Sequence, residues 1–143
     1  MEQVILRGSV PEYFGYGYGY GYGDGYGSKE YWSKTIPYFA AKWPEAQRLR
    51  LENLRASGAT IAFWKSDKDG RACNGGKNAR VTVGTVETAK GPLALCNSGT
   101  LHATLLPPKW KGERWWVVAL IGEVVSDEDK FGALKREILG ECE

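Results

Sequence analysis

A chain of 143 residues has room for one folded domain, and its net charge of +2 is too small to favour a nucleic-acid-binding domain. No apolar run approaches the roughly 18 residues of a membrane span, and the short run Val4–Leu6 is too short for a secretory signal. Three widely spaced cysteines argue against a disulfide framework. These features predict a soluble, cytoplasmic protein with reduced thiols.

The first 28 residues differ sharply in composition from the rest of the chain. Tyrosine and glycine alternate through most of Tyr13–Gly27, and all eight tyrosines lie at or before Tyr38. A period of two is strand geometry and places the rings on one face of an extended chain, although glycine loses much backbone entropy on ordering. Two interpretations stay open: a disordered tether, or a tyrosine ladder that self-associates by stacking.

Self-association is the preferred functional interpretation of this segment. Stacking on nucleic-acid bases has less support, because Tyr13–Gly27 contains no Lys or Arg and cationic contacts supply most of the non-specific affinity for phosphate. The rings assigned to self-association are those of Tyr16, Tyr18, Tyr20, Tyr22 and Tyr26. We expect residues 1–28 to form a low-complexity head, 29–43 an aromatic connector that packs on the domain, and 44–143 a compact domain.

A helix is predicted from Pro44 to Ser57, because proline suits a helix start and Gly58 is a natural stop. Its arginines and Lys42 offer a phosphate-binding alternative. Charges of this kind more often lie in solvent, and Arg48 is spaced to pair with Glu52.

Strands are predicted over four segments: Ala59–Trp64, Arg80–Glu87, Leu93–Cys96 and Arg114–Val125. The last is almost continuously apolar, which predicts a central strand covered on both faces. Phe131, Leu134 and Ile138 follow helical spacing and predict a closing helix, with an edge strand over Ala133–Leu139 as the alternative. The predicted fold is α+β, a small and mostly antiparallel sheet with one N-terminal and one C-terminal helix.

Few residues are suited to catalysis. The only histidine, His102, follows Cys96 by six residues, and a thiolate nucleophile needs its base within hydrogen-bond reach. Structural zinc needs four closely spaced ligands, which Cys73, Cys96 and Cys142 do not provide. A hydrogen-bonded structural histidine is the commoner alternative. The weak catalytic candidates are His102, Cys96, Arg114 and Glu123, and we expect neither a metal nor a cofactor.

The loop Pro107–Arg114 is the best candidate for a binding surface, because it interleaves aromatic and cationic residues. Its candidate binding residues, with the start of the next strand, are Lys109, Trp110, Lys111, Arg114 and Trp115. Such groups side by side can clamp a nucleotide, a phosphate or an acidic protein face. Alternatively, the tryptophans anchor the loop to the core and the charges lie in solvent.

Six sequence words stand out beyond these patterns: Ala62–Asp67, Cys73–Gly76, Gly91–Leu93, Leu101–Leu105, Pro108–Arg114 and Asp129–Ile138. Through them the chain resembles proteins of bacteriophages and prophages that carry a Gly-Tyr-rich stretch before a small domain of unknown function. The likeness runs from about Ile36 to the C-terminus, and it implies a mobile-element origin in a bacterial host without implying an activity. The segment Cys96–Ala103, with the strand and Gly-Glu that follow, is also similar to small domains related to ADP-ribosyltransferase-like folds.

The expected function is that of a non-enzymatic phage or prophage accessory protein. Its domain would bind a host or virion macromolecule, and its head would tether the protein or self-associate. One alternative is a small nucleotide-acting enzyme that uses His102 with Arg114 or Glu123. Another is a single-stranded nucleic-acid binder that uses the tyrosines and the Lys-Trp-Lys loop.

Overall fold

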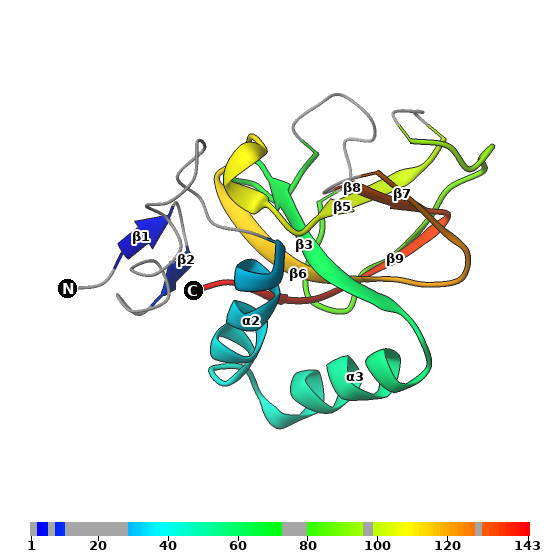
Figure 1. Cartoon of the computed structure of the whole chain (residues 1–143). Coiled ribbons are helices and arrows are strands. Elements are labelled where there is room, and N and C mark those ends of the chain that lie inside the picture. The colour runs from blue at the N-terminus through cyan, green and yellow to red at the C-terminus, as the bar shows by residue number, and fades with distance from the viewer. Residues whose placement is uncertain (1–2, 6–7, 11–28, 73–79, 96–98, 128–129) are drawn as a thin grey trace.

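The computed structural model describes residues 3–5, 8–10, 29–72, 80–95, 99–127 and 130–143 (Figure 1). Near the N-terminus, β1 (Gln3–Ile5) and β2 (Gly8–Val10) form a two-stranded antiparallel sheet. The tyrosines assigned to self-association lie outside the described residues. Two consecutive helices, α2 (Lys29–Ala40) and α3 (Glu45–Ala56), then precede the main sheet.

Seven antiparallel strands form the main sheet, which confirms the predicted α+β class and strand direction. Their order across the sheet is β4-β9-β6-β3-β5-β8-β7. Their bounds are β3 (Thr60–Ser66), β4 (Val86–Thr88), β5 (Leu101–Thr104), β6 (Arg114–Leu120), β7 (Val124–Asp127), β8 (Lys130–Ala133) and β9 (Lys135–Glu141). One turn of 3-10 helix, η1 (Pro107–Lys109), precedes β6.

Strand β6 is covered on both faces, as its apolar sequence predicts. Successive side chains of a strand point to opposite faces, so β6 contributes to two separate cores. Trp115, Val117 and Ala119 pack into a first core with the helices, and Trp116, Val118 and Leu120 pack into a second core on the other face. All six are at most 2 % exposed.

The first core is built on aromatic rings of α2, which lies with α3 on one side of the sheet (Figure 1). The Trp32 ring lies 5.7 Å from the Trp115 ring and meets Phe63 edge-to-face at 6.2 Å. Phe39, two turns further along the same face of α2, also meets Phe63 edge-to-face at 6.4 Å. Residues 29–43, expected to pack on the domain as a connector, therefore include a helix that supplies part of its core.

The second core is enclosed because the sheet curls. Strands β9 and β5 are separated by β6 and β3, which in a flat sheet would place them roughly 14 Å apart. Nevertheless, the Arg136 guanidinium on β9 donates a hydrogen bond to the His102 carbonyl oxygen on β5 over 2.7 Å. The β5-β8-β7 part of the sheet therefore folds over the β3-β6-β9 part, and the second core fills the space between them.

The predictions for α3 and β3 are confirmed with small shifts at their ends. Pro44 is the residue before α3, and Gly58 follows its end with φ +100°, a backbone conformation that glycine adopts without strain. The predicted strand Ala59–Trp64 corresponds to β3. Phe63 at the centre of β3 and its neighbour Ala62 are fully buried.

The predicted closing helix is wrong, because the C-terminal segment forms β8 and β9. The helix-like spacing of its apolar residues coincides with a strand buried on both faces: Ile138 packs in the second core and the adjacent Leu139 in the first. The alternative, an edge strand, has the right type but the wrong position. Strand β9 lies inside the sheet, between β4 and β6.

Three other predicted strand boundaries need correction. Of the second predicted strand, Arg80–Glu87, only Val86 and Glu87 lie in the sheet, as part of β4. A turn at Thr82–Thr85 precedes them, with the Thr82 N–H donating to Thr85 Oγ1. Residues 93–95 form no strand, and Cys96 lies outside the described residues. The long predicted strand Arg114–Val125 is split by a turn at Gly122, where φ is +91°.

Replacing Gly140 of β9 should destabilise the fold. The Trp43 indole lies against the Gly140 backbone, and its Nε1–H donates to the Glu141 carbonyl over 3.0 Å, so an added methyl group would overlap the ring. We expect Gly140→Ala to lower the free energy of unfolding by about 1–3 kcal/mol in urea denaturation. Ser33→Ala, on the exposed side of α2, serves as the control, and equal stability of the two variants would contradict this packing.

Candidate functional site

A buried ion pair holds the curled sheet together from inside. Arg136 is 5 % exposed, and its Nε and Nη2 each lie 2.8 Å from one carboxylate oxygen of Glu87 on β4. Its guanidinium also lies 4.4 Å from the centre of the Trp64 ring. Burial lowers the pKa of Arg136, and the Glu87 carboxylate opposes that shift. These contacts connect strands β9, β4, β3 and β5, which gives Arg136 a structural role.

His102 lies on β5, close to this cation, and its side chain is half-buried. Its pKa is lowered from the ordinary value first by burial and then by the positive charges of Arg136 and Lys130. The imidazole is therefore neutral near pH 7. Because Cys96 lies outside the described residues, its pairing with His102 stays a prediction.

The candidate catalytic residues Arg114 and Glu123 are not brought together. Arg114 makes a bidentate ion pair with Glu141, with N–O distances of 2.8 and 2.7 Å, and its guanidinium lies 4.6 Å from the centre of the Trp116 ring. Glu123 is exposed beyond the far end of β6, a strand of seven residues that is about 20 Å long. The Arg114 side chain is thus held by Glu141 at the start of β6, whereas Glu123 lies beyond the end of β6.

His102 is also separated from Arg114, because the two side chains belong to opposite faces of the sheet. Phe63 of β3 pairs with both Val117 on β6 and Thr104 on β5. Residues two apart share a face of a strand, so His102 belongs to the Val117 face. Arg114 lies over Trp116 on the other face. This strand register therefore does not bring His102 and Arg114 together in one catalytic centre.

The candidate binding loop is attached to the body of the domain by its tryptophans. Trp110 is half-buried against the second core, and Trp115 is fully buried in the first. Lys111 is exposed, and the Lys109 side chain is outside the described part of the structure. This arrangement matches the alternative in which the tryptophans anchor the loop. Among the described candidate binding residues it leaves Trp110 and Lys111 accessible to a partner, with the exposed Glu113 nearby in the chain.

A buried lysine lies beneath this loop and was not predicted from the sequence. Lys65 is 4 % exposed, and its Nζ donates to the Trp110 carbonyl oxygen over 2.8 Å and lies 4.2 Å from the centre of the Trp115 ring. Gly112 passes directly over Lys65, where a Cβ would overlap the lysine side chain. Among the described residues, the buried Trp115 Nε1–H has no acceptor. Lys65 thus ties the loop to β3, and only its place in an apolar run could have suggested burial.

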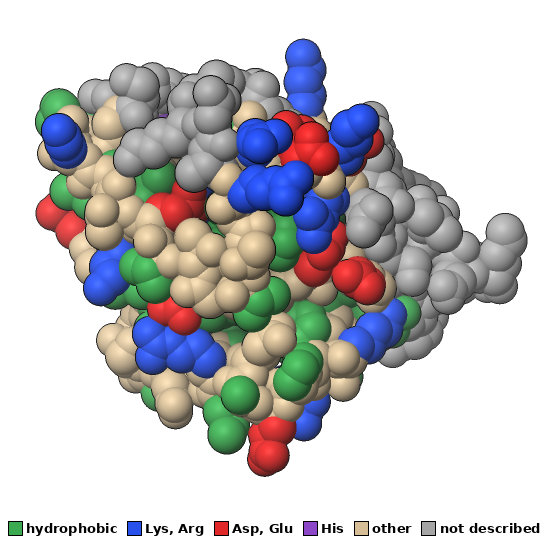
Figure 2. All heavy atoms as spheres, turned by 180° about the vertical axis from the view of Figure 1, so that it is seen from behind, with side chains coloured by type: hydrophobic (Ala, Val, Ile, Leu, Met, Phe, Trp, Pro, Cys, Tyr) green, Lys and Arg blue, Asp and Glu red, His purple; other side chains and the backbone are tan. Residues whose placement is uncertain are grey.

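Charges of both signs lie beside one another on the face seen in Figure 2, where Lys and Arg side chains alternate with Asp and Glu. Opposite charges also lie close together in the turn after β3, where Arg71 lies 3.7 Å from Asp69. The pKa of Asp67 in that turn is lowered, chiefly by the backbone N–H of Arg71. This mixed pattern differs from the basic stripe that is typical of nucleic-acid-binding domains.

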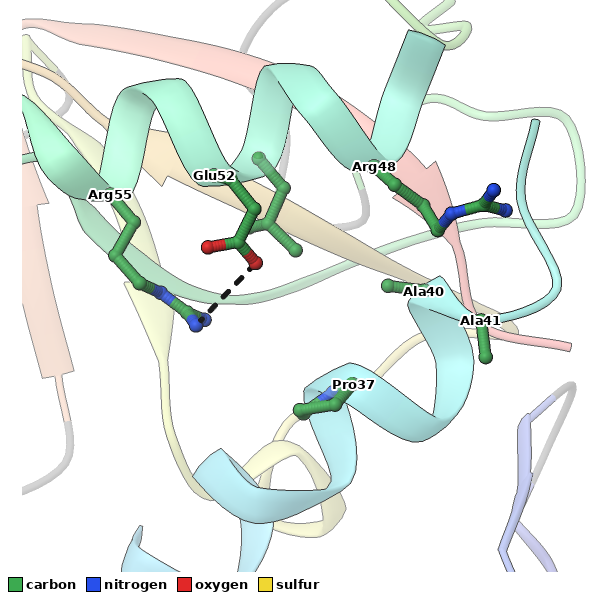
Figure 3. Close-up of a pocket in the computed structure, with 7 residues that line it drawn as sticks. Pro37, Ala40, Ala41, Arg48, Glu52 and Arg55 are labelled. Atoms are coloured by element: carbon green, nitrogen blue, oxygen red, sulfur yellow. Dashed lines mark ion pairs between the residues drawn. The ribbon is translucent and has the colours of Figure 1, made fainter. Parts of the chain in front are cut away.

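A groove of about 240 Å³ lies between α2 and α3 (Figure 3). Pro37, Ala40 and Ala41 line it from α2 and the turn that follows, and Arg48, Leu51, Glu52 and Arg55 line it from α3. The α2 side chains are small, which leaves this space open between the helices. The groove therefore has an apolar floor and a charged rim.

In the structure, the predicted ion pair between Arg48 and Glu52 does not form at the rim. The Arg48 guanidinium donates instead to the Trp43 carbonyl oxygen. Glu52 pairs with Arg55 at 4.0 Å, and both side chains are largely exposed, at 64 % and 45 %. Exposed pairs of this length contribute little to stability, so Arg55 can turn toward another group at small cost.

Comparison of the chain with protein-family models, curated proteins and solved structures finds no match. Among the residues that the structure describes, no helix is long and apolar enough to cross a membrane. The same residues contain no group of three His, Cys, Asp or Glu side chains arranged to hold a metal ion.

Breaking the buried ion pair should destabilise the protein strongly. Glu87→Gln keeps the size of the side chain but leaves the Arg136 cation without its counter-charge in a buried environment. We expect a loss on the order of 3 kcal/mol in the free energy of unfolding, measured by urea denaturation. Glu123→Gln, in the exposed turn after β6, is the matched control. A loss as small as that of the control would show that the pair is not structural.

The single histidine permits a direct test of its environment. An NMR titration of His102 should give a pKa below the unperturbed value of about 6.5. The unfolded chain then binds the proton at a higher pH than the folded chain, so stability is complete above about pH 6.5 and falls as the pH drops through the folded pKa. His102→Gln should remove this part of the pH dependence. A measured pKa above 6.5 would contradict the geometry described here.

Proposed function

We propose that this protein is a non-enzymatic binding protein of phage or prophage origin. In this proposal the folded domain contacts a host or virion macromolecule, and the head, residues 1–28, tethers the protein or self-associates. The proposed origin rests on the sequence resemblance. The proposed activity rests on how the head is joined to the domain.

The observation that carries the proposal is the burial of α2. This helix begins at Lys29, directly after the head, and its residues Tyr31 and Trp32 are only 3 % and 2 % exposed. Because these rings pack in the first core, the attachment point of the head is fixed to the body of the domain. A fixed attachment suits a segment that acts as a tether, because a force applied to the head is transmitted directly to the core.

The composition of the head supports self-association as its role. Residues 11–28 contain six tyrosines and Phe14, without Lys or Arg. Ring-to-ring contacts are individually weak, about 1 kcal/mol each, so they become effective only when several act together. The seven aromatic rings of a single head are enough to act together.

The partner surface of the domain is proposed to include the loop with Trp110 and Lys111. A half-buried aromatic ring beside an exposed cation suits an acidic protein face. The nucleotide-acting enzyme has less support, because Glu141 engages Arg114 and the strand register puts His102 and Arg114 on opposite faces of the sheet. The single-stranded nucleic-acid binder also has less support, because Trp115 is buried and the tyrosine-rich residues 11–28 contain no Lys or Arg.

Removing the head tyrosines should abolish self-association. The head variant is the full chain with Tyr13→Ser, Tyr16→Ser, Tyr18→Ser, Tyr20→Ser, Tyr22→Ser and Tyr26→Ser. Sedimentation velocity over a concentration series should show assembly of the wild type and a monomeric head variant, because the stacking rings are gone. Tyr38→Phe, on α2, controls for the loss of a phenol outside the head. A wild type that stays monomeric at high concentration would contradict the proposed role of the head.

A further inference from the structure

We propose that the groove between α2 and α3 binds a tyrosine side chain from the head of a second copy of this chain. This inference rests on the proposed self-association and gives it a specific docking site. Head-to-groove contacts would then join copies, in addition to or in place of contacts between heads.

The size and lining of the groove suit one aromatic side chain. Its volume of about 240 Å³ is below the roughly 300–1,000 Å³ of pockets that hold drug-sized ligands. Ala40, Ala41 and Leu51 provide apolar contacts for the ring face. The rim residues Arg48, Glu52 and Arg55, labelled in Figure 3, are exposed, so a phenol hydroxyl beside them could keep its hydrogen bonds to water.

Two guanidinium groups lie at this rim and suit a tyrosine better than an aliphatic side chain. Arg48 uses one nitrogen for the Trp43 carbonyl and retains its remaining donors, since a guanidinium carries five N–H groups. The Arg55 side chain is 45 % exposed, and its ion pair with Glu52 is long, with an N–O distance of 4.0 Å. Because this pair holds it weakly, Arg55 can move over an incoming ring. Arginine is attracted to the face of an aromatic ring and can donate to a phenol oxygen.

Charge complementarity favours the head as the occupant. Residues 11–28 contain Glu12 and Asp24 and no Lys or Arg, so this segment is acidic as well as aromatic. Helix α3 presents the opposite sign, because Arg48, Arg50 and Arg55 outnumber its acidic residues Glu45 and Glu52. Arg50 is held by Glu137 at 2.8 Å, which leaves Arg48 and Arg55 to attract the head.

Each head offers several rings to the groove of another copy. A head carries six tyrosines before Lys29, whereas the domain presents this groove to a single ring. Any one of the six rings can therefore enter a neighbouring copy's groove that is empty. Linked sites of this kind increase the apparent affinity without any new contact.

A complementation experiment with full-length chains tests the proposal. The groove variant carries Ala41→Leu and Arg55→Gln, two exposed positions, so the groove is filled and loses a cation. The head variant carries the six serine substitutions described above. In sedimentation velocity, each variant alone should associate at least tenfold more weakly than the wild type. An equimolar mixture should regain association, because one chain supplies the head and the other supplies an intact groove.

Matched controls separate this inference from the proposed function. A chain with Ala94→Leu and Arg80→Gln carries the same chemical changes at exposed positions that do not line the groove, and it should associate like the wild type. If the groove variant also associates like the wild type, heads bind each other and the groove inference falls, while the proposed function stands. A mixture no stronger than its components, meaning that each head binds only its own domain, also overturns the inference.

Protein stability is checked by thermal unfolding of every variant. Where Ala41→Leu lowers the melting temperature, Arg55→Gln alone replaces the groove variant. It should still weaken self-association several-fold, and an unchanged association constant overturns the proposal. If the wild type itself does not associate, both the groove inference and the proposed self-association are overturned.

Discussion

The domain depends on one constraint, which is that strand β6 must be covered on both faces. Its odd-numbered residues from Trp115 belong to the core under the helices, and its even-numbered residues from Trp116 belong to the core inside the curled sheet. Both covers are therefore required: α2 and α3 on one side, and the β5-β8-β7 part of the sheet on the other. The buried Arg136–Glu87 pair belongs to the second cover, since it connects β9 to β4 and to β5.

The cations of the core are used in the same way, and this shapes the functional conclusion. Lys65, Arg114 and Arg136 each lie over a tryptophan ring, at 4.2, 4.6 and 4.4 Å from its centre. Cationic and aromatic residues that look like a ligand-binding pattern in the sequence are thus largely engaged with each other. In the described part of the chain, the loop with Trp110 and Lys111 and the groove between the helices stay accessible, and the proposed contacts use these two features.

The sequence predicted the elements whose pattern has one explanation. The continuous apolar run of β6 and the proline and glycine at the ends of α3 are of this kind. The C-terminal strands were missed because Phe131, Leu134 and Ile138 fit a helical period, and the contrary evidence, burial of Ile138 and Leu139 on opposite faces, exists only in three dimensions. The groove also could not be predicted from the sequence, because it arises where small residues of α2 meet α3 across a turn.

The strands at the two edges of the main sheet are short, with three residues in β4 and four in β7. A long exposed edge offers unpaired N–H and C=O groups to any other strand and promotes aggregation, whereas edges this short offer few. In β7, Ser126 and Asp127 are also exposed, and their polarity disfavours further pairing. The folded domain is thus poorly suited to polymerise through its backbone. In the proposed self-association, assembly would then be governed by side chains, which would keep it reversible and sensitive to salt or to a competing aromatic ligand.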